Sequence, residues 1–212
     1  MRQVRRYLHV AVLVAALNVL TAGVLAAENA QPFDVAKYFV ASGWMGDGEL
    51  KTEYVQLADA CPTNPHSGPT CIQVTYKPGP NGWAGIYWQN EADNWGDKAG
   101  EDFSKKDYAR VTFWAKGEKG GETIEFKAGG IAAPGKPYKD SFQVKLGKET
   151  LKKEWTKYTM DLKGAKLSSV IGGFCWVASG TANPEGAKFY LDDIQYEPAN
   201  YKEPAATTEQ KK

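Results

Sequence analysis

Short runs of β-branched and aromatic residues alternate along this chain with turns that contain glycine or proline. Runs of this length and composition are typical of β-strands, and their regular spacing favours a β-sandwich or a β-barrel. Beyond the first 27 residues no stretch keeps a helical period for three turns, although residues 28–39 are compatible with one short turn of helix. The expected strands cover residues 71–76, 84–90, 109–116, 123–129, 141–146, 156–162, 173–179 and 188–196.

The run WAGIYWQ at residues 83–89 divides its aromatic side chains between two faces. Successive side chains of a strand point in opposite directions, so Ile86 and Trp88 share an apolar face that we predict to lie in the core. Trp83 and Tyr87 share the opposite face with the polar Gln89. We therefore expect Trp83 and Tyr87 to contact a ligand.

The next three runs repeat this alternation. Trp114 stands in a polar row with Arg110, and the polar faces of the two runs that follow hold Glu125 and Gln143. The opposite rows are apolar and supply a core without any of these side chains. The expected core residues of the three runs are Val111, Phe113, Ala115, Ile124, Phe126, Phe142, Val144 and Leu146.

Aromatic side chains on a polar strand face have two explanations. Either a loop or a second layer covers them, or they form a platform for a sugar, whose apolar ring face stacks on an aromatic ring. The hydroxyl groups of a sugar also need polar partners, which the same face would supply. Under the second explanation, the candidate ligand-binding residues are Trp83, Tyr87, Gln89, Arg110, Trp114, Glu125 and Gln143.

The first 27 residues have the features of a secretory signal peptide. Arg2, Arg5 and Arg6 precede an apolar run, and Ala26 and Ala27 provide the small residues of a cleavage site. An uncleaved anchor is the alternative. We expect a secreted or periplasmic protein with no membrane association after cleavage, a folded domain over residues 28–197, and a disordered polar tail over residues 198–212.

Charge and length narrow the classes of partner. Removal of the three N-terminal arginines takes the formal charge from +1 to −2, so nothing in the balance favours nucleic acid. The remaining length suits one domain with a sizeable core, which we expect to be a monomer.

Two of the three cysteines, Cys61 and Cys71, bracket a loop that proline and glycine already bend. An exported protein would oxidise this pair, and closing so short a loop would contribute roughly 2–3 kcal/mol. Cys175 stands in an apolar run, where we expect a buried and inert thiol. His66 lies inside the bracketed loop and has no further His or Cys ligands for a zinc site once the pair is oxidised.

The run FYLDDIQYE at residues 189–197 resembles the last strand of the galactose-binding-domain-like jelly-roll carbohydrate-binding modules that are appended to bacterial glucanases and xylanases. EWTKYTMDLKG at residues 154–164 and YARVTFWAKG at residues 108–117 extend the resemblance, which spans residues 33–197. It implies an all-β, two-sheet antiparallel β-sandwich of the jelly-roll type. It also implies a non-catalytic module that binds a polysaccharide or oligosaccharide, with a β-glucan as one candidate, on a concave sheet face.

The resemblance also bears on the other tryptophans. Trp83, Tyr87 and Trp114 suit the binding face by alternation, and Trp176 is either a core residue or a further part of the platform. Trp155 resembles a structural cover in related modules. Trp95 follows Asp93 and Asn94 in a loop-like segment, so we expect it at the rim of the site.

Related modules often hold a structural calcium ion near the two chain ends. The matching acidic residues here are Asp47 and Glu49 in SGWMGDGEL, with Asp192 and Asp193 in FYLDDIQ. Calcium takes six to eight oxygen ligands, and an acidic turn with glycines can add backbone carbonyls. The resemblance thus implies a calcium clasp at these four residues, and a solvated acidic turn is the alternative.

Two other classes of function stay open at this point. A jelly-roll glycoside hydrolase would need two carboxylates that converge across a cleft, and strand alternation already explains Glu125 without chemistry. A Ser–His–Asp site has no GxSxG sequence to support it. A structural or adhesion protein of the cell envelope would use the same aromatic side chains against a protein partner.

Overall fold

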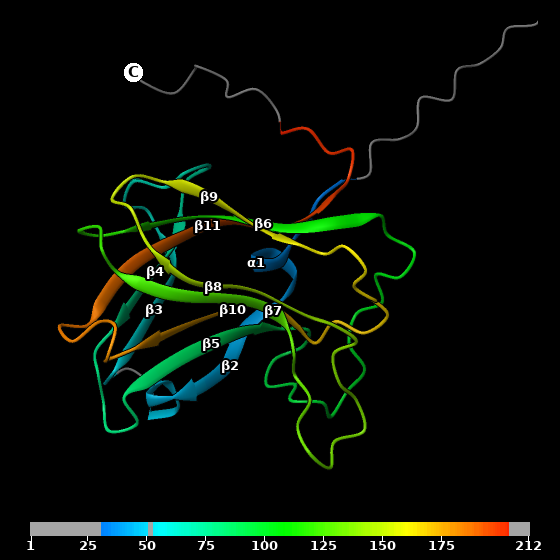
Figure 1. Ribbon diagram of the computed structural model, residues 1–212, viewed down its shortest axis with the longest axis horizontal. Helices are drawn as coiled ribbons and strands as arrows, with labels where there is room; N and C mark the ends of the chain where they lie inside the picture. The colour runs from blue at the N-terminus through cyan, green and yellow to red at the C-terminus, as the bar shows by residue number, and fades with distance from the viewer. Residues whose placement is uncertain (1–30, 51–52, 204–212) are drawn as a thin grey trace, which may run out of the picture.

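The computed structural model describes residues 31–50 and 53–203, in which the chain forms two packed antiparallel sheets (Figure 1). Sheet A has six strands and sheet B has five, so the expected two-sheet β-sandwich is confirmed. A short helix, α1 (Val35–Tyr38), precedes the first strand of sheet B, and a 3-10 helix, η1 (Asp47–Leu50), follows that strand. The strand order in sheet A is β3 (Val55–Cys61), β4 (Cys71–Tyr76), β11 (Ala187–Pro198), β6 (Tyr108–Gly117) and β9 (Thr156–Asp161), and β1 (Phe33–Asp34) also pairs with β11. The strand order in sheet B is β2 (Val40–Gly46), β5 (Trp83–Gln89), β10 (Gly172–Ser179), β7 (Thr123–Gly129) and β8 (Gln143–Thr150).

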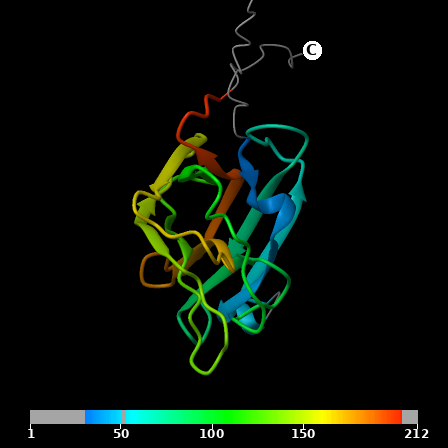
Figure 2. The same cartoon turned by 90° about the vertical axis from the view of Figure 1, so that its right-hand side faces the viewer.

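Consecutive strands seldom belong to the same sheet. Among the described strands, only β3 with β4 and β7 with β8 are neighbours both along the chain and within a sheet. Each other connection carries the chain from one sheet to the other, which is typical of double-sheet jelly rolls. In Figure 2 the loops at one end of the sandwich face the viewer, including residues 90–107 and 130–142.

The hydrophobic pattern located every described strand except β1, β2 and β3. The last two have only one neighbour each, because β2 lies at an edge of sheet B and β3 at an edge of sheet A. Edge strands need less apolar surface than central strands, and β3 accordingly exposes residues 58–60. Such segments show too little alternation for recognition by pattern.

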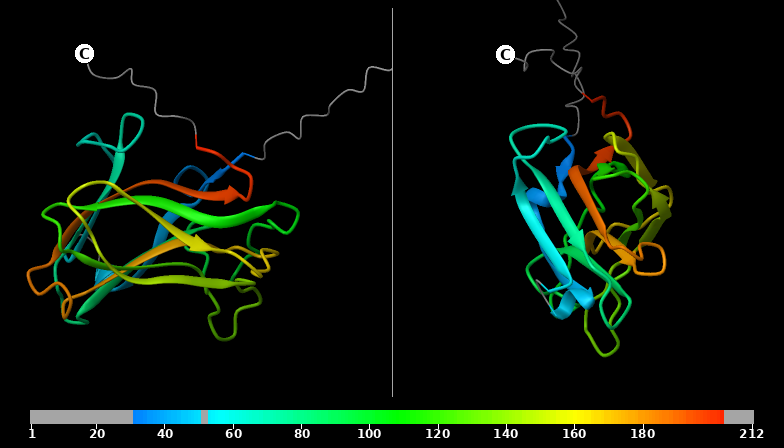
Figure 3. Two further views of the ribbon diagram at one scale, coloured as in Figure 1. Left: turned by 45° about the horizontal axis from the view of Figure 1, so that its top comes forward. Right: turned by 90° about the vertical axis from the view of Figure 1, so that its left-hand side faces the viewer.

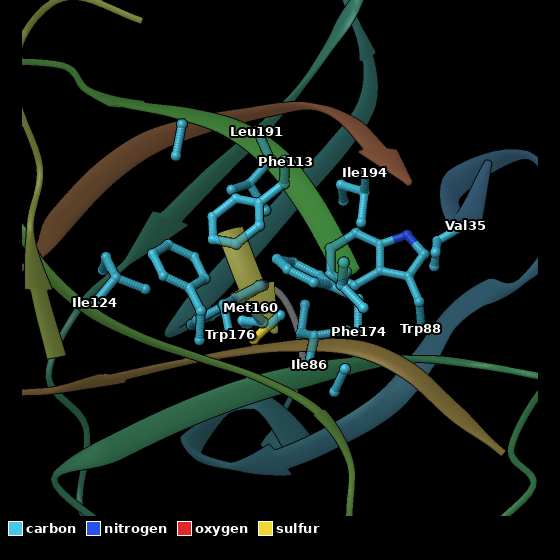
Figure 4. Close-up of a cluster of buried hydrophobic side chains, with 14 of the residues drawn as sticks. Val35, Ile86, Trp88, Phe113, Ile124, Met160, Phe174, Trp176, Leu191 and Ile194 are labelled. Atoms are coloured by element: carbon cyan, nitrogen blue, oxygen red, sulfur yellow. The ribbon is translucent and has the colours of Figure 1, made fainter. Parts of the chain in front are cut away.

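Aromatic side chains from both sheets meet in the core (Figure 4). The ring of Phe113 on β6 lies 4.6 Å from that of Phe126 and 4.9 Å from that of Phe174, both of which belong to sheet B. Trp88 is only 3% exposed and packs edge-on against Phe174 at 5.7 Å. The expected inward rows of β5, β6, β7 and β8 are therefore confirmed.

Trp176 belongs to this core and is not part of a binding platform. It pairs in register with Ile86 on β5 and with Phe126 on β7, and both of these neighbours face inward. The side chain is fully buried and packs edge-on against Phe189 at 5.3 Å. Cross-strand partners share a face of the sheet, so the pairing with β5 and β7 fixes Trp176 in the inward direction. The apolar run GFCWVAS alone did not show this direction.

The ends of the described chain lie side by side, because β1 pairs with the C-terminal part of β11 (Figure 3). Residues 198–203, which the sequence assigned to a disordered tail, form the end of β11 and a turn that stays attached to sheet A. The Tyr201 carbonyl accepts a hydrogen bond from Arg110, and Glu203 forms an ion pair with Lys157 at 3.0 Å. The expected signal peptide and the rest of the tail lie outside the described residues.

Within residues 31–50 and 53–203, no helix has the length and apolar character needed to cross a membrane.

Cys61 and Cys71 are direct partners across β3 and β4, and both are buried as free thiols. The Cα–Cα separation of opposite residues in an antiparallel pair falls within the range that a disulfide spans. The geometry is therefore compatible with the cross-link, which stays a prediction. Cys175 lies on β10 in sheet B and is fully buried, and burial raises the pKa of its thiol to about 12. That position supports the expected inert thiol.

We predict that replacing Trp88 with alanine lowers the free energy of unfolding by roughly 3–5 kcal/mol, because the substitution leaves a cavity against Phe174. Urea denaturation measures this change. Trp83→Ala is the matched control: its ring is 39% exposed, and its removal should cost less than about 1 kcal/mol. A larger loss for Trp83→Ala than for Trp88→Ala would show that β5 has been assigned to the wrong faces.

We also predict that the air-oxidised protein contains a Cys61–Cys71 disulfide and an unpaired Cys175. Digestion under non-reducing conditions followed by mass spectrometry identifies the linked peptides. The double variant Cys61→Ala/Cys71→Ala should unfold with a free energy lower by roughly 2–3 kcal/mol than the oxidised protein. Any cross-link that contains Cys175 would contradict this assignment.

Candidate functional site

An open groove of about 700 Å³ lies at the β2 edge of sheet B. Three tryptophans line it: Trp83, which is 39% exposed, the half-buried Trp95, and Trp44, which also packs against the core. Met45 contributes apolar surface, and the carboxylates of Glu49 and Asp93 contribute hydrogen-bond acceptors. The other lining residues are Ala41, Ser42 and Gly46.

Trp83 is positioned by the turn that precedes β5. The buried Asp47 carboxylate accepts hydrogen bonds from the backbone N–H groups of Gly79 and Asn81, at 3.0 and 2.7 Å. The ring of Trp83 lies against Gly46, where an added Cβ atom would come within 2.9 Å of the indole. Gly46 also has a φ of +62°, so this position favours glycine on two counts. Asp47 and Gly46 together hold the exposed indole at the edge of the sheet.

Trp95 is positioned by a loop that hydrogen-bonds to itself. The side-chain oxygen of Asn94, which is 3% exposed, accepts from the N–H groups of Gly96 and Lys98. Its side-chain nitrogen donates to the carbonyls of Asn90 and Lys98, both at 3.1 Å. This closed network supports Trp95 at the rim of the groove, where the sequence placed it.

Tyr87 faces outward as its alternation predicted, but it is only 3% exposed. Trp95 packs edge-on against its ring at 6.1 Å, and its hydroxyl group donates to the Gly129 carbonyl at 3.0 Å. Burial raises the pKa of this hydroxyl group. The expectation that Tyr87 contacts a ligand directly is therefore wrong, because a loop covers it, and Tyr87 instead supports Trp95.

Gln89 is also a structural residue, and not the sugar-binding residue that the sequence suggested. The side chain is fully buried. Its oxygen accepts from the Ser42 hydroxyl at 2.7 Å, and its nitrogen donates to the Asn94 carbonyl at 2.8 Å. Both of its polar atoms thus connect β5 to β2 and to the Trp95 loop.

A second loop, residues 130–141, covers the same row of sheet B. The buried Asp140 carboxylate accepts from the N–H groups of Ile131, Ile171 and Gly172. Burial raises the pKa of Asp140 to about 6, against the lowering effect of these donors. The loop thereby places Ile131 in a small apolar cluster with Tyr87.

The remaining outer surface of sheet B runs from the groove toward β8. In one row of register, Met45 pairs with Gly85, Gly85 with Val177, and Val177 with Glu125. Glu125 is partly exposed, and Gln143 at the start of β8 is exposed. Two further predicted residues therefore share the outer face of sheet B with Trp83.

Trp114 and Arg110 lie on the outer face of the other sheet. Both belong to β6 in sheet A, so they point away from the sandwich on the side opposite Trp83. The expectation of one platform containing Trp83 and Trp114 is wrong. Alternation assigned each of them correctly to a face of its own strand, but it carries no information about which sheet the strand joins.

Arg110 is bound within the protein. Its Nε donates to the Glu197 carboxylate at 2.7 Å, and Glu197 is 2% exposed. Burial would raise the pKa of Glu197, but hydrogen bonds from Thr112, Arg110 and Lys157 outweigh burial and lower it. Arg110 therefore neutralises a buried carboxylate, and its guanidinium group is engaged within the protein and not directed at a sugar.

The loop between Cys61 and Cys71 covers Trp114. The His66 ring stacks on the indole with centroids 3.7 Å apart. Trp155 donates from its indole nitrogen to the Asn64 carbonyl at 3.0 Å, which supports its expected role as a structural cover. Asp193 accepts from the Ser67 hydroxyl and lies 2.7 Å from His66 Nδ1. Ser67 thus donates to Asp193 and not to His66, so no Ser–His relay forms.

The four predicted calcium ligands do not converge. Asp47 holds the turn before β5, and Glu49 is an exposed residue of the groove. Asp192 accepts from the backbone N–H groups of His66 and Ser67, at 2.9 and 3.2 Å, and so fastens the loop on sheet A. In the described part of the chain, no three His, Cys, Asp or Glu side chains lie close enough to hold a metal ion. The structure gives the predicted clasp no support, because Asp47 and Asp192 bind different loops and Glu49 lies in the groove.

Sequence reasoning missed Met45, Glu49 and Asp93 as lining residues of the groove. The dense Asn, Asp and Gly content of residues 90–97 did indicate a turn-rich loop. The strand pattern of β2, however, was too weak to place Met45 beside Trp83. The groove depends on β2 pairing with β5, which only the tertiary structure shows.

Comparison with known proteins adds information at the level of the fold. No protein-family model matches the chain, and no curated protein matches it by sequence. Among solved structures, the family 11 carbohydrate-binding module from Clostridium thermocellum, in complex with a β-1,3-1,4-mixed-linked tetrasaccharide, superposes with a TM-score of 0.52 at 12% identity. The match covers 80% of this chain and 95% of that module.

Two further structures agree with this match. A family 30 carbohydrate-binding module gives a TM-score of 0.50 at 17% identity, over 86% of this chain and 92% of the module. The family 11 module of a cellulosomal cellulase of Clostridium thermocellum gives 0.51 at 11% identity, over 80% and 94%. The chain therefore has the β-sandwich fold of carbohydrate-binding modules.

Proposed function

We propose that this protein is an exported, non-catalytic carbohydrate-binding protein that holds a polysaccharide chain in the groove between Trp83 and Trp95. The observation that carries the proposal is the groove itself, which presents two accessible indoles beside the carboxylates of Glu49 and Asp93. Indoles offer flat apolar surface for the ring faces of sugars, and carboxylates accept hydrogen bonds from their hydroxyl groups. The shared fold adds support, because one of the similar modules was solved in complex with a β-1,3-1,4-mixed-linked tetrasaccharide. A β-glucan backbone is the ligand class that this likeness favours.

The open shape of the groove suits a chain more than a single sugar. It follows the edge of sheet B, where β2 pairs with β5 alone among the described strands. A site open at an edge leaves room for a polymer to continue past both tryptophans. Export is supported by the signal-peptide features of residues 1–27.

The carboxylates of the groove favour binding over hydrolysis. A glycosidase needs two carboxyl groups that face each other across the sugar, one of them held in an apolar environment. Glu49 and Asp93 are both exposed. Burial raises the pKa of Asp140, but this carboxylate is bound by backbone N–H groups under a loop and does not line the groove.

The prediction is that Trp83→Ala weakens binding of a soluble mixed-linked β-glucan by about 10- to 100-fold, equivalent to roughly 1–3 kcal/mol, because the variant loses one stacking surface. Affinity gel electrophoresis and calorimetry measure the change. The melting temperature should stay close to that of the unmodified protein, since the ring is exposed.

Tyr38→Ala is the matched control, because Tyr38 is an even more exposed aromatic residue, at 58%, and lies outside the groove. It should bind the glucan as tightly as the unmodified protein. Equal binding by Trp83→Ala, or an equal loss in Tyr38→Ala, would place the ligand elsewhere. A protein that binds none of the glucans, xylans or mannans offered to it would contradict the proposed function.

A further inference from the structure

We propose that the bound polysaccharide is acidic, and that Lys127, Lys145 and Lys148 on sheet B hold its carboxylate groups. The inference rests on the proposed function, because it concerns the outer face that contains Trp83. It narrows the ligand from any β-linked chain to one that bears uronate or equivalent carboxylate substituents.

The three lysines gather on the outer face of strands β7 and β8. Lys127 follows the inward-facing Phe126, and Lys145 lies between two residues that pack on the core, so both point outward. Lys127 and Lys145 are register partners, and Lys148 pairs with the outward-facing Glu125. The patch therefore contains three cations and one carboxylate.

These lysines have no carboxylate partner within ion-pair distance among the described residues, whereas Lys98, Lys136 and Lys188 each have one and Lys157 has two. The interaction found for Lys127 is with the ring of Tyr87, 4.9 Å from the ammonium nitrogen. Like charges directly opposite each other destabilise a sheet. A cluster of this kind on a face that already presents an aromatic groove is complementary to an anionic ligand.

The patch is continuous with the groove. A single row of register leads from Met45 through Gly85, Val177 and Glu125 to Lys148. Five neighbouring strands span about 19 Å, which is the length of an oligosaccharide and not of one sugar. The middle of the row holds glycine and valine, so Glu125 is the one large side chain of the row between them and Lys148. A chain that lies across the strands can stack on Trp83 at one end and bring acidic substituents to the lysines at the other.

The experiment compares two soluble polymers that share one backbone: carboxymethyl cellulose, which is anionic, and hydroxyethyl cellulose, which is neutral. The test variant is Lys145→Glu/Lys148→Glu. The control variant is Lys105→Glu/Lys106→Glu, which makes the same change in net charge at two exposed residues outside sheet B. Binding is measured at about 0.02 M and about 0.5 M salt, because exposed charges are screened at the higher concentration. Circular dichroism checks that each variant is folded.

We expect the unmodified protein to bind the anionic polymer more tightly at low salt, and the preference to fall at high salt. The test variant should lose on the order of tenfold in affinity for the anionic polymer, with its affinity for the neutral polymer unchanged. The control variant should retain the preference.

Equal binding of the two polymers by the unmodified protein, or an equal loss in both double variants, would overturn the inference. Provided that Trp83→Ala still weakens binding, either result would leave the proposed function standing. Failure to bind either polymer, together with no effect of Trp83→Ala on any glycan, would overturn both.

Discussion

The burial of one face of each sheet against the other is the constraint on which the rest of this structure depends. Phe113 from sheet A meets Phe126 and Phe174 from sheet B, so the strands that carry these rings cannot rotate or slip by one residue. With the inner faces fixed, every alternate side chain is committed to an outer face. Trp83 in the groove and the lysines of the patch are side chains that the core does not use.

The loops cover the outer faces of the two sheets to different extents. On sheet A, the loop between Cys61 and Cys71 lies over Trp114, and the turn after β11 is attached to Arg110. On sheet B, the loops at residues 90–98 and 130–141 cover the row that contains Tyr87 but leave Trp83 exposed. An aromatic side chain that faces outward is therefore available to a ligand only where no loop lies over it.

Buried and partly buried carboxylates hold these loops in place. Asp47 binds the turn before Trp83, Asp140 binds the loop beside Tyr87, and Asp192 binds the loop over Trp114. Each accepts hydrogen bonds from backbone N–H groups, which satisfies donors that a loop cannot pair within itself. Acidic residues that bind the backbone of a loop can thus have the same sequence pattern as acidic residues that bind a metal ion.

The sequence by itself determined the all-β class, the expected strands beyond β3, and the inward or outward direction of residues such as Trp88 and Trp83. It could do so because alternation is a local property of an extended backbone, with a period of two residues. Only the tertiary structure decided that β5 and β6 belong to opposite sheets, that a loop buries Tyr87, and that Asp47 and Asp192 bind separate loops. These outcomes depend on pairing between segments far apart in the chain, and the alternation within one strand does not change with the partner that the strand selects.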